Sequence, residues 1–372
     1  MERPMNVVFR ADASLDIGSG HVMRCLTLAN ALKMRGCKVS FICRSTKGNM
    51  ISFIETSGFS VFPLPPSPQM AIQETLTGRA IYQSWLGVSA DEDASQTIAQ
   101  LQPLTADWLI VDHYGIDVQW ETLLRSHCHK LMVIDDLADR QHECDLLLDQ
   151  SLGREASAYL RLAPAECRLA MGADYALLRP EFALWRDESL RRRTDGVVSH
   201  ILISMGGIDK NNATSAVLSC LKTYPLAPEA RITVVMGSHA PWLEAVERMS
   251  AKMPVKADIR VNVEDMAHLM TESDLSIGAA GSSAWERCCL GLPSIIVVQA
   301  ENQIGVAKAL EKHRCAKVLP TGLNIDESLP KAMRAFGTPS FVREMQHNCM
   351  SMIDGDGVQR ICTKIFELGG TS

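Results

Sequence analysis

Short apolar runs alternate along the chain with longer stretches in which apolar residues recur at helical spacing. Four such runs lie in the first half of the sequence: Asn6–Arg10, Val39–Cys43, Trp108–Asp112 and Leu131–Asp135. They are almost continuously apolar, which is typical of parallel strands covered on both faces. Helical patterns such as Val22–Arg35 and Ser95–Leu101 lie between them. This alternation predicts a doubly wound α/β domain.

A second series of the same kind begins near residue 198, and a chain of 372 residues is long enough for two domains. Its predicted strands are His200–Ser204, Arg231–Met236, Asp274–Gly278 and Ser294–Val298. We therefore expect two α/β domains in tandem, residues 1–185 and residues 197–372, joined by a linker at Trp185–Gly196.

Two segments outside the predicted elements carry unusual composition. The arginine run Arg191–Arg193 could clamp a phosphate, but a solvated connector is the interpretation we prefer. Pro63–Pro68 is predicted to be a proline-rich loop.

The charge balance excludes one class of function. Lys and Arg total 37 and Asp and Glu total 43, so the net charge is −6. Broad nucleic-acid binding needs a basic face and is therefore not expected, although backbone amides could still hold a small anion.

Cysteine usage and the chain start indicate the compartment. The 12 cysteines include no C-x-x-C pair, which suggests reduced, mostly buried residues of a cytosolic protein. Met1–Asp12 lacks the apolar core of a signal peptide, and no run of about 18 apolar residues could span a membrane. Spacing within His127–His129 and His142–Cys144 fits no common zinc motif, so we predict no metal site.

The segment Arg10–Arg24 carries the first candidate chemistry. Gly18 and Gly20 lie between a predicted strand and a predicted helix, where glycine lets a ligand approach the backbone and the helix offers free N–H groups. His21 then falls in the first turn, whose positive end disfavours imidazolium and favours a neutral ring that can act as a base. The alternative is that this histidine only caps the loop.

Polar side chains also follow two further strands of the first half. Asp107–Gly115 delivers Asp112, His113 and Tyr114 to one edge of the sheet, and Val133–Asp136 ends in two carboxylates. These acids could bind hydroxyl groups of a ligand. Equally, Asp112 and Asp135 could cap the helices that follow.

The second half repeats this pattern at three loops. Ser204–Asn212 contains Gly206 and Gly207 before a helix, which suits phosphate. Gly278–Pro293 places small residues at a strand end and Glu286 in the first helical turn, so that the helix start suits a diphosphate and the carboxylate a ribose diol. A capping box is the alternative role of Glu286. Amides of Gln299–Gln303 could read sugar hydroxyls.

Six segments of the chain occur in an order that resembles a known family. They are Arg10–Arg24, Trp85–Ser89, Val111–Gly115, Tyr175–Arg179, Met205–Asp209 and Ser282–Glu286. Together, from about residue 5 to about residue 325, they resemble the UDP-2,4-diacetamido-2,4,6-trideoxy-β-L-altropyranose hydrolases. One position departs from the pattern, because Ile208 stands where threonine is expected.

The resemblance implies two Rossmann-like domains facing across a cleft, as in the glycosyltransferase-B architecture. It implies a sugar-binding, catalytic N-terminal domain and a UDP-binding C-terminal domain. His21 matches the family's catalytic base, and Ser282, Ser283 and Glu286 match its nucleotide loop. Members need no metal or other cofactor and release UDP by attack of water at the anomeric carbon with inversion, in pseudaminic acid biosynthesis.

We thus expect a cytoplasmic enzyme whose partner is a small UDP-sugar, with no nucleic acid, membrane or obligatory protein partner. Arg179 either binds substrate or makes a structural ion pair. The predicted substrate ligands are Arg10, Asp12, Gly18, Gly20, Arg24, Asp112, His113, Tyr114, Arg179, Gly206, Gly207, Gly281, Ser282, Ser283, Glu286, Asn302 and Gln303. Alternatives are a glycosyltransferase of the same fold, a hydrolysing UDP-sugar 2-epimerase, and a nucleotide-sugar-binding regulator without turnover.

Overall fold

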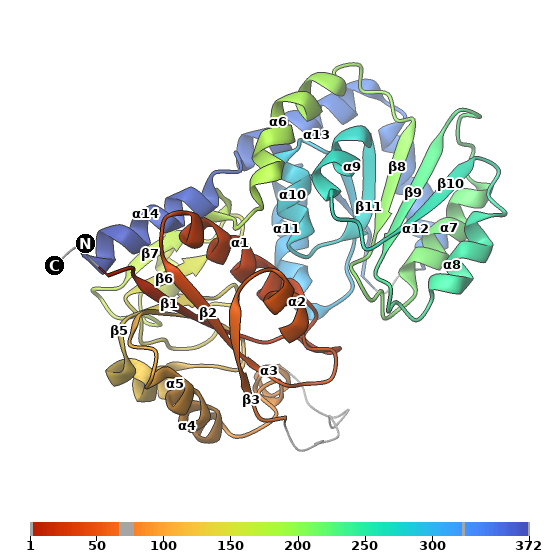
Figure 1. Ribbon diagram of the computed structural model, residues 1–372. Helices are drawn as coiled ribbons and strands as arrows, with labels where there is room; N and C mark the ends of the chain where they lie inside the picture. The colour runs from red at the N-terminus through yellow and green to blue at the C-terminus, as the bar shows by residue number, and fades with distance from the viewer. Residues whose placement is uncertain (1–2, 67–77, 322–323, 371–372) are drawn as a thin grey trace. The chain divides into compact units, whose positions relative to one another are not determined.

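The computed structural model describes residues 3–66, 78–321 and 324–370 and divides the chain into two compact units. The first unit comprises Met1–Leu177 together with Asp356–Ser372, and the second comprises Leu178–Gly355. Each unit is a parallel sheet with helices on both faces (Figure 1). The two α/β domains expected from the strand pattern are therefore present.

The first unit is built on a seven-stranded parallel sheet of order β3-β2-β1-β4-β5-β6-β7. Its strands are β1 (Asn6–Ala11), β2 (Lys38–Arg44), β3 (Ser60–Leu64), β4 (Ala106–Asp112), β5 (Cys128–Ile134), β6 (Leu146–Asp149) and β7 (Arg168–Met171). All four strands predicted here are confirmed. The pattern missed β6 and β7, which have four residues each.

The loop predicted at Pro63–Pro68 is wrong in its first part. Pro63 lies within β3, which is an edge strand of the sheet. Edge positions tolerate proline because its missing N–H can face away from the ladder. Residues 67 and 68 lie outside the described part of the chain.

Helices of the first unit cover both faces of its sheet (Figure 1). Alternate residues of β1 show the two layers: Val7 and Phe9 pack in a core that includes α1 and α14, and Val8 packs in a core that includes α4 and α5. The helices are α1 (Gly20–Met34), α2 (Ile51–Thr56), α3 (Arg79–Ser84), α4 (Ala90–Leu101), α5 (Val118–Leu124) and α14 (Gly357–Gly369).

The second unit has a six-stranded parallel sheet of order β10-β9-β8-β11-β12-β13. The strands are β8 (His200–Ser204), β9 (Arg231–Met236), β10 (Lys256–Val261), β11 (Leu275–Ala279), β12 (Ser294–Val297) and β13 (Lys317–Val318). The helices are α6 (Pro180–Arg192), α7 (Ala213–Thr223), α8 (Leu243–Ser250), α9 (Met266–Glu272), α10 (Ser283–Cys289), α11 (Ile304–Lys312), α12 (Ile325–Phe336) and α13 (Pro339–Met352).

The predicted C-terminal domain, residues 197–372, is wrong at its C-terminal end. Helix α14 belongs to the first unit, where Val358, Ile361 and Ile365 are buried in the same core as Phe9. Their helical spacing forms an apolar stripe that needs a partner surface. The sequence could not show which of the two sheets supplies that surface, because the prediction gave each domain one continuous segment of chain.

The predicted linker at Trp185–Gly196 is also wrong. Most of it is α6, which belongs to the second unit, and the chain passes between units at Leu177 and Leu178. Arg193 is 2% exposed and donates to the carbonyls of Ser273 and Leu290, at 2.6 and 2.8 Å. Ser273 and Leu290 are far from Arg193 in the sequence, so the arginine run gave no sign of these contacts. Arg193 is therefore buried, although the run was predicted to be solvated.

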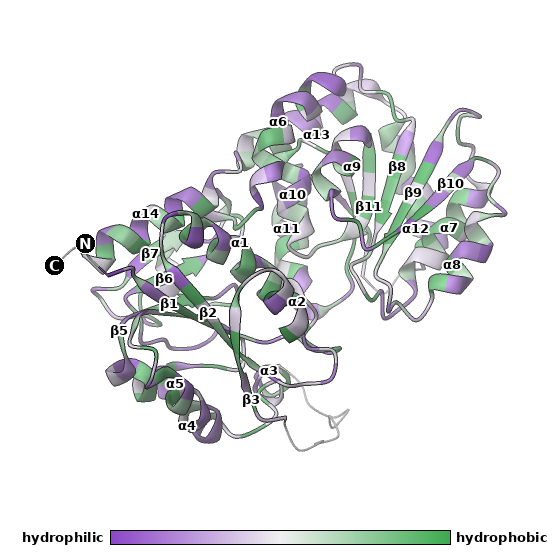
Figure 2. Cartoon of the chain, viewed as in Figure 1, coloured by the Kyte–Doolittle hydropathy of each residue, from purple (hydrophilic) through white to green (hydrophobic). Residues whose placement is uncertain are grey.

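Apolar residues gather on the strands, while the exposed helix faces are mostly polar (Figure 2). Within the described ranges, no helix combines the length and apolar character required to cross a bilayer. The apolar surface of these helices is instead used for packing on the sheets.

In each unit, strand order reverses at one place. The chain runs outward from β1 to β2 and β3, and then returns to β4 on the other side of β1; β8 and β11 are related in the same way. Open α/β sheets bind ligands at the carboxyl ends of strands beside such a switch point. The polar loops singled out in the sequence follow these four strands and their neighbours.

Candidate active site

The loop after β1 brings His21 to the switch point of the first unit. Gly18 has φ +78°, a left-handed conformation that a side chain would strain. Gly20 opens α1, and a Cβ built on either glycine meets no atom within 4 Å. The backbone in front of His21 is therefore open enough for a ligand to approach it closely.

His21 is held by Asp112, the last residue of β4. The distance between Nδ1 of His21 and Oδ1 of Asp112 is 2.6 Å. Arg24, one turn further along α1, donates to both oxygens of the same carboxylate, at 2.6 and 2.7 Å. Burial opposes ionisation of Asp112, but Arg24 and then His21 outweigh it and lower the pKa of this carboxyl group.

An ionised Asp112 determines which ring nitrogen of His21 carries the proton. A carboxylate only accepts hydrogen bonds, so Nδ1 of the neutral ring donates and Nε2 presents its lone pair. No other described residue bonds to Nε2, and the residue keeps 8% of its surface exposed. This is the arrangement of a general base steadied by a carboxylate.

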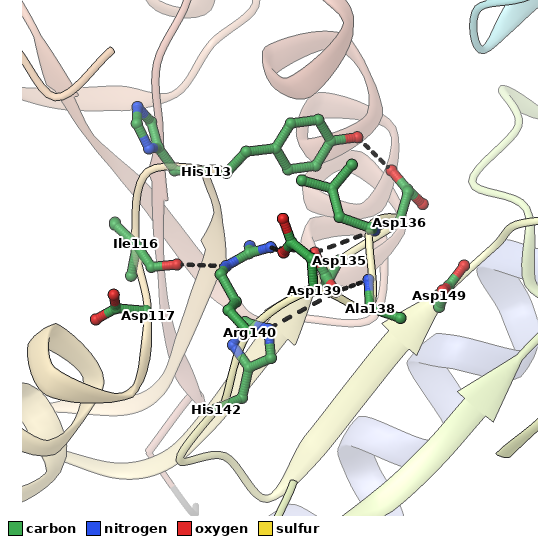
Figure 3. Close-up of polar contacts among 12 residues, drawn as sticks. His113, Ile116, Asp117, Asp135, Asp136, Ala138, Asp139, Arg140, His142 and Asp149 are labelled. Atoms are coloured by element: carbon green, nitrogen blue, oxygen red, sulfur yellow. Dashed lines mark hydrogen bonds and ion pairs between the residues drawn. The ribbon is translucent and has the colours of Figure 1, made fainter. Parts of the chain in front are cut away.

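Asp136, at the end of the adjacent strand β5, completes this cluster. Its Oδ2 accepts hydrogen bonds from the Tyr114 hydroxyl at 2.7 Å and from Arg24 at 2.5 Å. In Figure 3 a dashed line marks the hydrogen bond that Asp136 accepts. Its other oxygen, Oδ1, is buried and has no hydrogen-bond partner among the described residues. Asp136 thus offers one vacant acceptor, which a hydroxyl or amide N–H of a ligand could fill.

Three aromatic rings line the same region. The ring of Tyr114 lies edge-on to His21 with a centroid separation of 4.5 Å. Trp85 stacks on Tyr114 at 6.0 Å, and Tyr82 meets Trp85 edge-on at 5.0 Å. Such a wall limits water near the base and presents flat faces to apolar groups. Tyr82 was not identified from the sequence, because an aromatic residue on an amphipathic stretch usually indicates core packing.

The predicted ligands Arg10 and Asp12 lie in the interior instead. Both are fully buried and joined at 2.6 Å, and Arg10 also bonds to Asp93 at 2.7 Å. Asp93 in turn accepts from Arg44 at 2.6 Å and from Trp120 at 3.0 Å. This charge cluster braces β1 and β2 against α4 and α5, so we do not carry Arg10 into the proposed site.

His113 is also buried, and its hydrogen bonds exclude it as a base. Its Nδ1 accepts from the backbone N–H of Gly115 at 3.0 Å, which places the proton of the neutral ring on Nε2. Nε2 lies 3.6 Å from Oδ2 of Asp12. Burial lowers the pKa of His113 to about 4, so that the ring stays neutral at pH 7 without a free lone pair.

Asp135 and Asp136 have separate roles although they are neighbours. Asp135 is fully buried and bonds to Arg140 at 2.6 Å and to the backbone N–H of Ala138 at 2.9 Å (Figure 3). It also accepts from the Tyr159 hydroxyl at 2.8 Å. It therefore holds the loop after β5. The capping alternative is wrong for Asp112, since Asp117 caps the helix after β4.

The loop after β8 shapes the switch point of the second unit. Gly206 has φ +92°, and a Cβ built on Gly206 or Gly207 meets nothing within 4 Å. Asp209 ends the loop by accepting from the backbone N–H groups of Ala213 and Thr214, both at 2.9 Å, at the start of α7. Glycine backbone is thus exposed beside a helix start, as the sequence predicted.

The loop after β11 supplies the second group of predicted ligands. A Cβ on Gly281 would also meet open space, and Ser282 does not cap α10 with its side chain. Ser283 Oγ accepts from Arg287 at 3.2 Å. Glu286 makes no hydrogen bond to another described residue, so the capping box is not formed. Burial raises the pKa of Glu286, although Arg179 opposes this effect from 4.0 Å.

Three further predicted ligands lie in the same unit. Arg179 precedes α6, forms an ion pair with Glu181 at 2.9 Å and donates to the Glu264 carbonyl at 3.2 Å. Asn302 and Gln303 form a short 3₁₀ turn, Glu301–Gln303, in which Gln303 Oε1 accepts from the Gln299 N–H at 3.0 Å.

Two Rossmann-like units with glycine-rich loops at their switch points define the glycosyltransferase-B class. Solved structures agree: MurG of Acinetobacter baumannii has a TM-score of 0.68 at 16% identity, covering 97% of this chain and 99% of MurG. The calicheamicin glycosyltransferase CalG4 has a TM-score of 0.62 at 12% identity, covering 99% and 98%. Residues 200–353 match the glycosyltransferase family 28 C-terminal domain.

The family follows from curated relatives. The UDP-2,4-diacetamido-2,4,6-trideoxy-β-L-altropyranose hydrolase of Campylobacter jejuni is 30% identical over 83% of this chain and 97% of its own length. The spore coat polysaccharide biosynthesis protein SpsG of Bacillus subtilis is 25% identical over 98% of both chains. The chain belongs to the family of that hydrolase, as its motif order indicated.

Proposed function

We propose that this protein hydrolyses a UDP-linked 2,4-diacetamido-2,4,6-trideoxy sugar to UDP and the free sugar. Water attacks the anomeric carbon with inversion, and the reaction serves pseudaminic acid biosynthesis in the cytoplasm. The observation that carries this proposal is the His21–Asp112 pair, which presents a free Nε2 lone pair beside the open loop after β1. Family membership supports the choice of substrate.

Each group then has a chemical task. UDP leaves readily, so activation of water is the main requirement, and Nε2 of His21 takes the proton as water attacks. Asp112 stabilises the positive charge that the ring acquires. The unfilled Oδ1 of Asp136 accepts a hydrogen bond from the sugar. No metal or organic cofactor takes part in these steps.

The second unit binds the nucleotide in this proposal. Backbone N–H groups near Gly206, Gly207 and Gly281 stabilise the diphosphate as charge develops on it. Glu286 binds the ribose diol, which is consistent with a carboxylate to which no described residue donates a hydrogen bond. Ser282 and Ser283 lie at the start of α10, and Asn302 and Gln303 lie in the segment that follows β12.

The bond that breaks is decided by running the reaction in ¹⁸O-water and weighing both products. Attack at carbon places the label in the sugar, as we expect. Label in UDP would instead mean attack at phosphorus and would overturn the mechanism.

The second candidate function is a glycosyltransferase, favoured by the fold and by the match to the glycosyltransferase family 28 C-terminal domain. Incubation with the UDP-sugar and no acceptor separates the two. Rapid release of UDP and free sugar supports the hydrolase, and an absolute need for an acceptor supports the transferase. Tight binding without any product would indicate a regulator.

A further inference from the structure

Three cysteines that are distant in sequence meet in the interior of the second unit. Cys288 lies on α10, Cys315 lies between α11 and β13, and Cys349 lies on α13. Their sulfur atoms are all within 4.8 Å of one another. The three residues are 3%, 1% and 0% exposed. We propose that they form a buried three-thiolate site for one soft divalent cation of the Zn²⁺ and Cd²⁺ class.

The spacing of the sulfur atoms fits such an ion. A metal–sulfur bond of about 2.3 Å places three sulfurs around one ion about 4.0 Å apart. The observed upper limit of 4.8 Å needs a contraction of less than about 1 Å. Thiolate ligands select soft ions over Mg²⁺ or Ca²⁺, and no carboxylate or imidazole belongs to this cluster of described residues.

Arg287, next to Cys288, supplies the matching charge. It is 1% exposed and takes part in no ion pair with another described residue, and its Nε has no hydrogen-bond partner there. Its other nitrogens bond to Ser283 Oγ and to the Ala279 carbonyl, at 3.2 and 2.7 Å. Three thiolates and a divalent ion carry one net negative charge, which this buried guanidinium would balance.

The protonated thiols are held only weakly in the absence of an ion. Cys349 donates to the Cys315 carbonyl at 3.1 Å, and Cys315 donates to the His313 carbonyl at 3.6 Å. A thiol is a poor donor, so loading would release three protons to solvent and replace these weak hydrogen bonds with three metal–sulfur bonds. Cys144 and Cys167, whose sulfurs are 3.6 Å apart in the first unit, have no third ligand among the described residues and serve as an internal comparison.

A bound ion would tie α10 to α13 and to the start of β13. Helix α10 also carries Glu286, so the ion would stiffen the unit that we propose binds UDP. The site itself stands apart from that proposal, because its evidence is the thiol geometry and its test measures metal binding.

The test is titration of the reduced, metal-free full-length protein with Cd²⁺, followed by ultraviolet spectroscopy. We expect a sulfur-to-cadmium charge-transfer band that saturates at one ion per chain, together with a higher melting temperature. Cys315→Ala should lose the band and the shift. Cys220→Ala, which removes another buried cysteine of the same unit, should keep both.

A second measurement holds even if Cys315→Ala folds poorly. In the wild-type protein, one equivalent of Cd²⁺ should protect Cys288, Cys315 and Cys349 from alkylation in mild denaturant, as peptide mapping by mass spectrometry would show. The absence of a stoichiometric band, or protection of Cys144 and Cys167 in place of these three, would overturn the proposal.

Discussion

Nδ1 of His21 lies 2.6 Å from Oδ1 of Asp112, although 91 residues separate them in the chain. The contact exists because β1 and β4 are adjacent parallel strands at the switch point of the first sheet. One strand leads into the helix that carries His21, and the other ends at Asp112. The topology of the sheet therefore creates the proposed base.

Replacing Asp112 tests whether the carboxylate sets the proton position on His21. Asp112→Asn keeps the shape but removes the charge that stabilises a protonated ring, so kcat should fall by about 10²–10⁴. Steady-state kinetics measures this fall, and circular dichroism checks folding, because Arg24 also loses a charged partner. A kcat within a few-fold of wild type would show that the contact is only structural.

A substitution of Asp136 tests whether its Oδ1, which no described residue bonds, accepts a hydrogen bond from the sugar. Asp136→Asn should raise KM for the UDP-sugar, with a cost of about 1–3 kcal/mol for a hydrogen bond to a charged group. The affinity for the product UDP should not change, since the second unit binds it in our proposal. Calorimetry with UDP alone provides this control, and equal losses for UDP and UDP-sugar would contradict a contact with the sugar.

Glu286 tests the nucleotide site. Glu286→Gln should weaken UDP binding by about 1–3 kcal/mol if the carboxylate holds the ribose diol. Glu181→Gln is a matched control, because it removes the other carboxylate beside Arg179. UDP affinity that is unchanged in a folded Glu286 variant, or lowered equally in both, would remove Glu286 from the site.

The raised pKa of His142 predicts how the stability of the protein depends on pH. Burial opposes its charge, but Asp135 and Glu121 outweigh this effect and raise the pKa of His142 to about 9 (Figure 3 shows it beside Asp135 and Arg140). The unfolded value is about 6.5, so the folded state binds the extra proton between these values. The stabilisation is complete below about pH 6.5 and is lost as pH rises toward 9.

The size of this loss follows from the shift. At about 1.36 kcal/mol per pKa unit, the free energy of unfolding should fall by up to about 3 kcal/mol across that window. Urea denaturation at several pH values measures it. His142→Gln should be less stable below pH 6.5 and should lack the decline; a variant that declines as steeply as wild type would contradict this role.

Much of the fold was predictable because buried parallel strands read as continuous apolar runs. The runs at Asn6–Arg10 and His200–Ser204 gave the centres of both sheets. The packing of α14 on the first unit was not predictable, because its apolar stripe fits either unit. The short strands β6 and β7 were also missed.

The site was predictable to the extent that function follows strand ends. His21, Asp112 and Tyr114 were found because each lies at or after the end of a buried strand. Arg10 and His113 share that position, and all five side chains are buried, but Arg10 and His113 are bonded to other partners. The sequence could not separate these cases, since the difference depends on Asp93 and Gly115 as partners. The cysteine cluster gave no signal because its members are far apart in the chain.

The most direct test of the account is the rate of His21→Asn. The variant should fold normally, bind UDP as wild type does, and lose about 10²–10⁴ in kcat, the usual contribution of a general base. If His21→Asn instead keeps kcat within a few-fold of wild type, His21 is structural and the proposed mechanism is wrong.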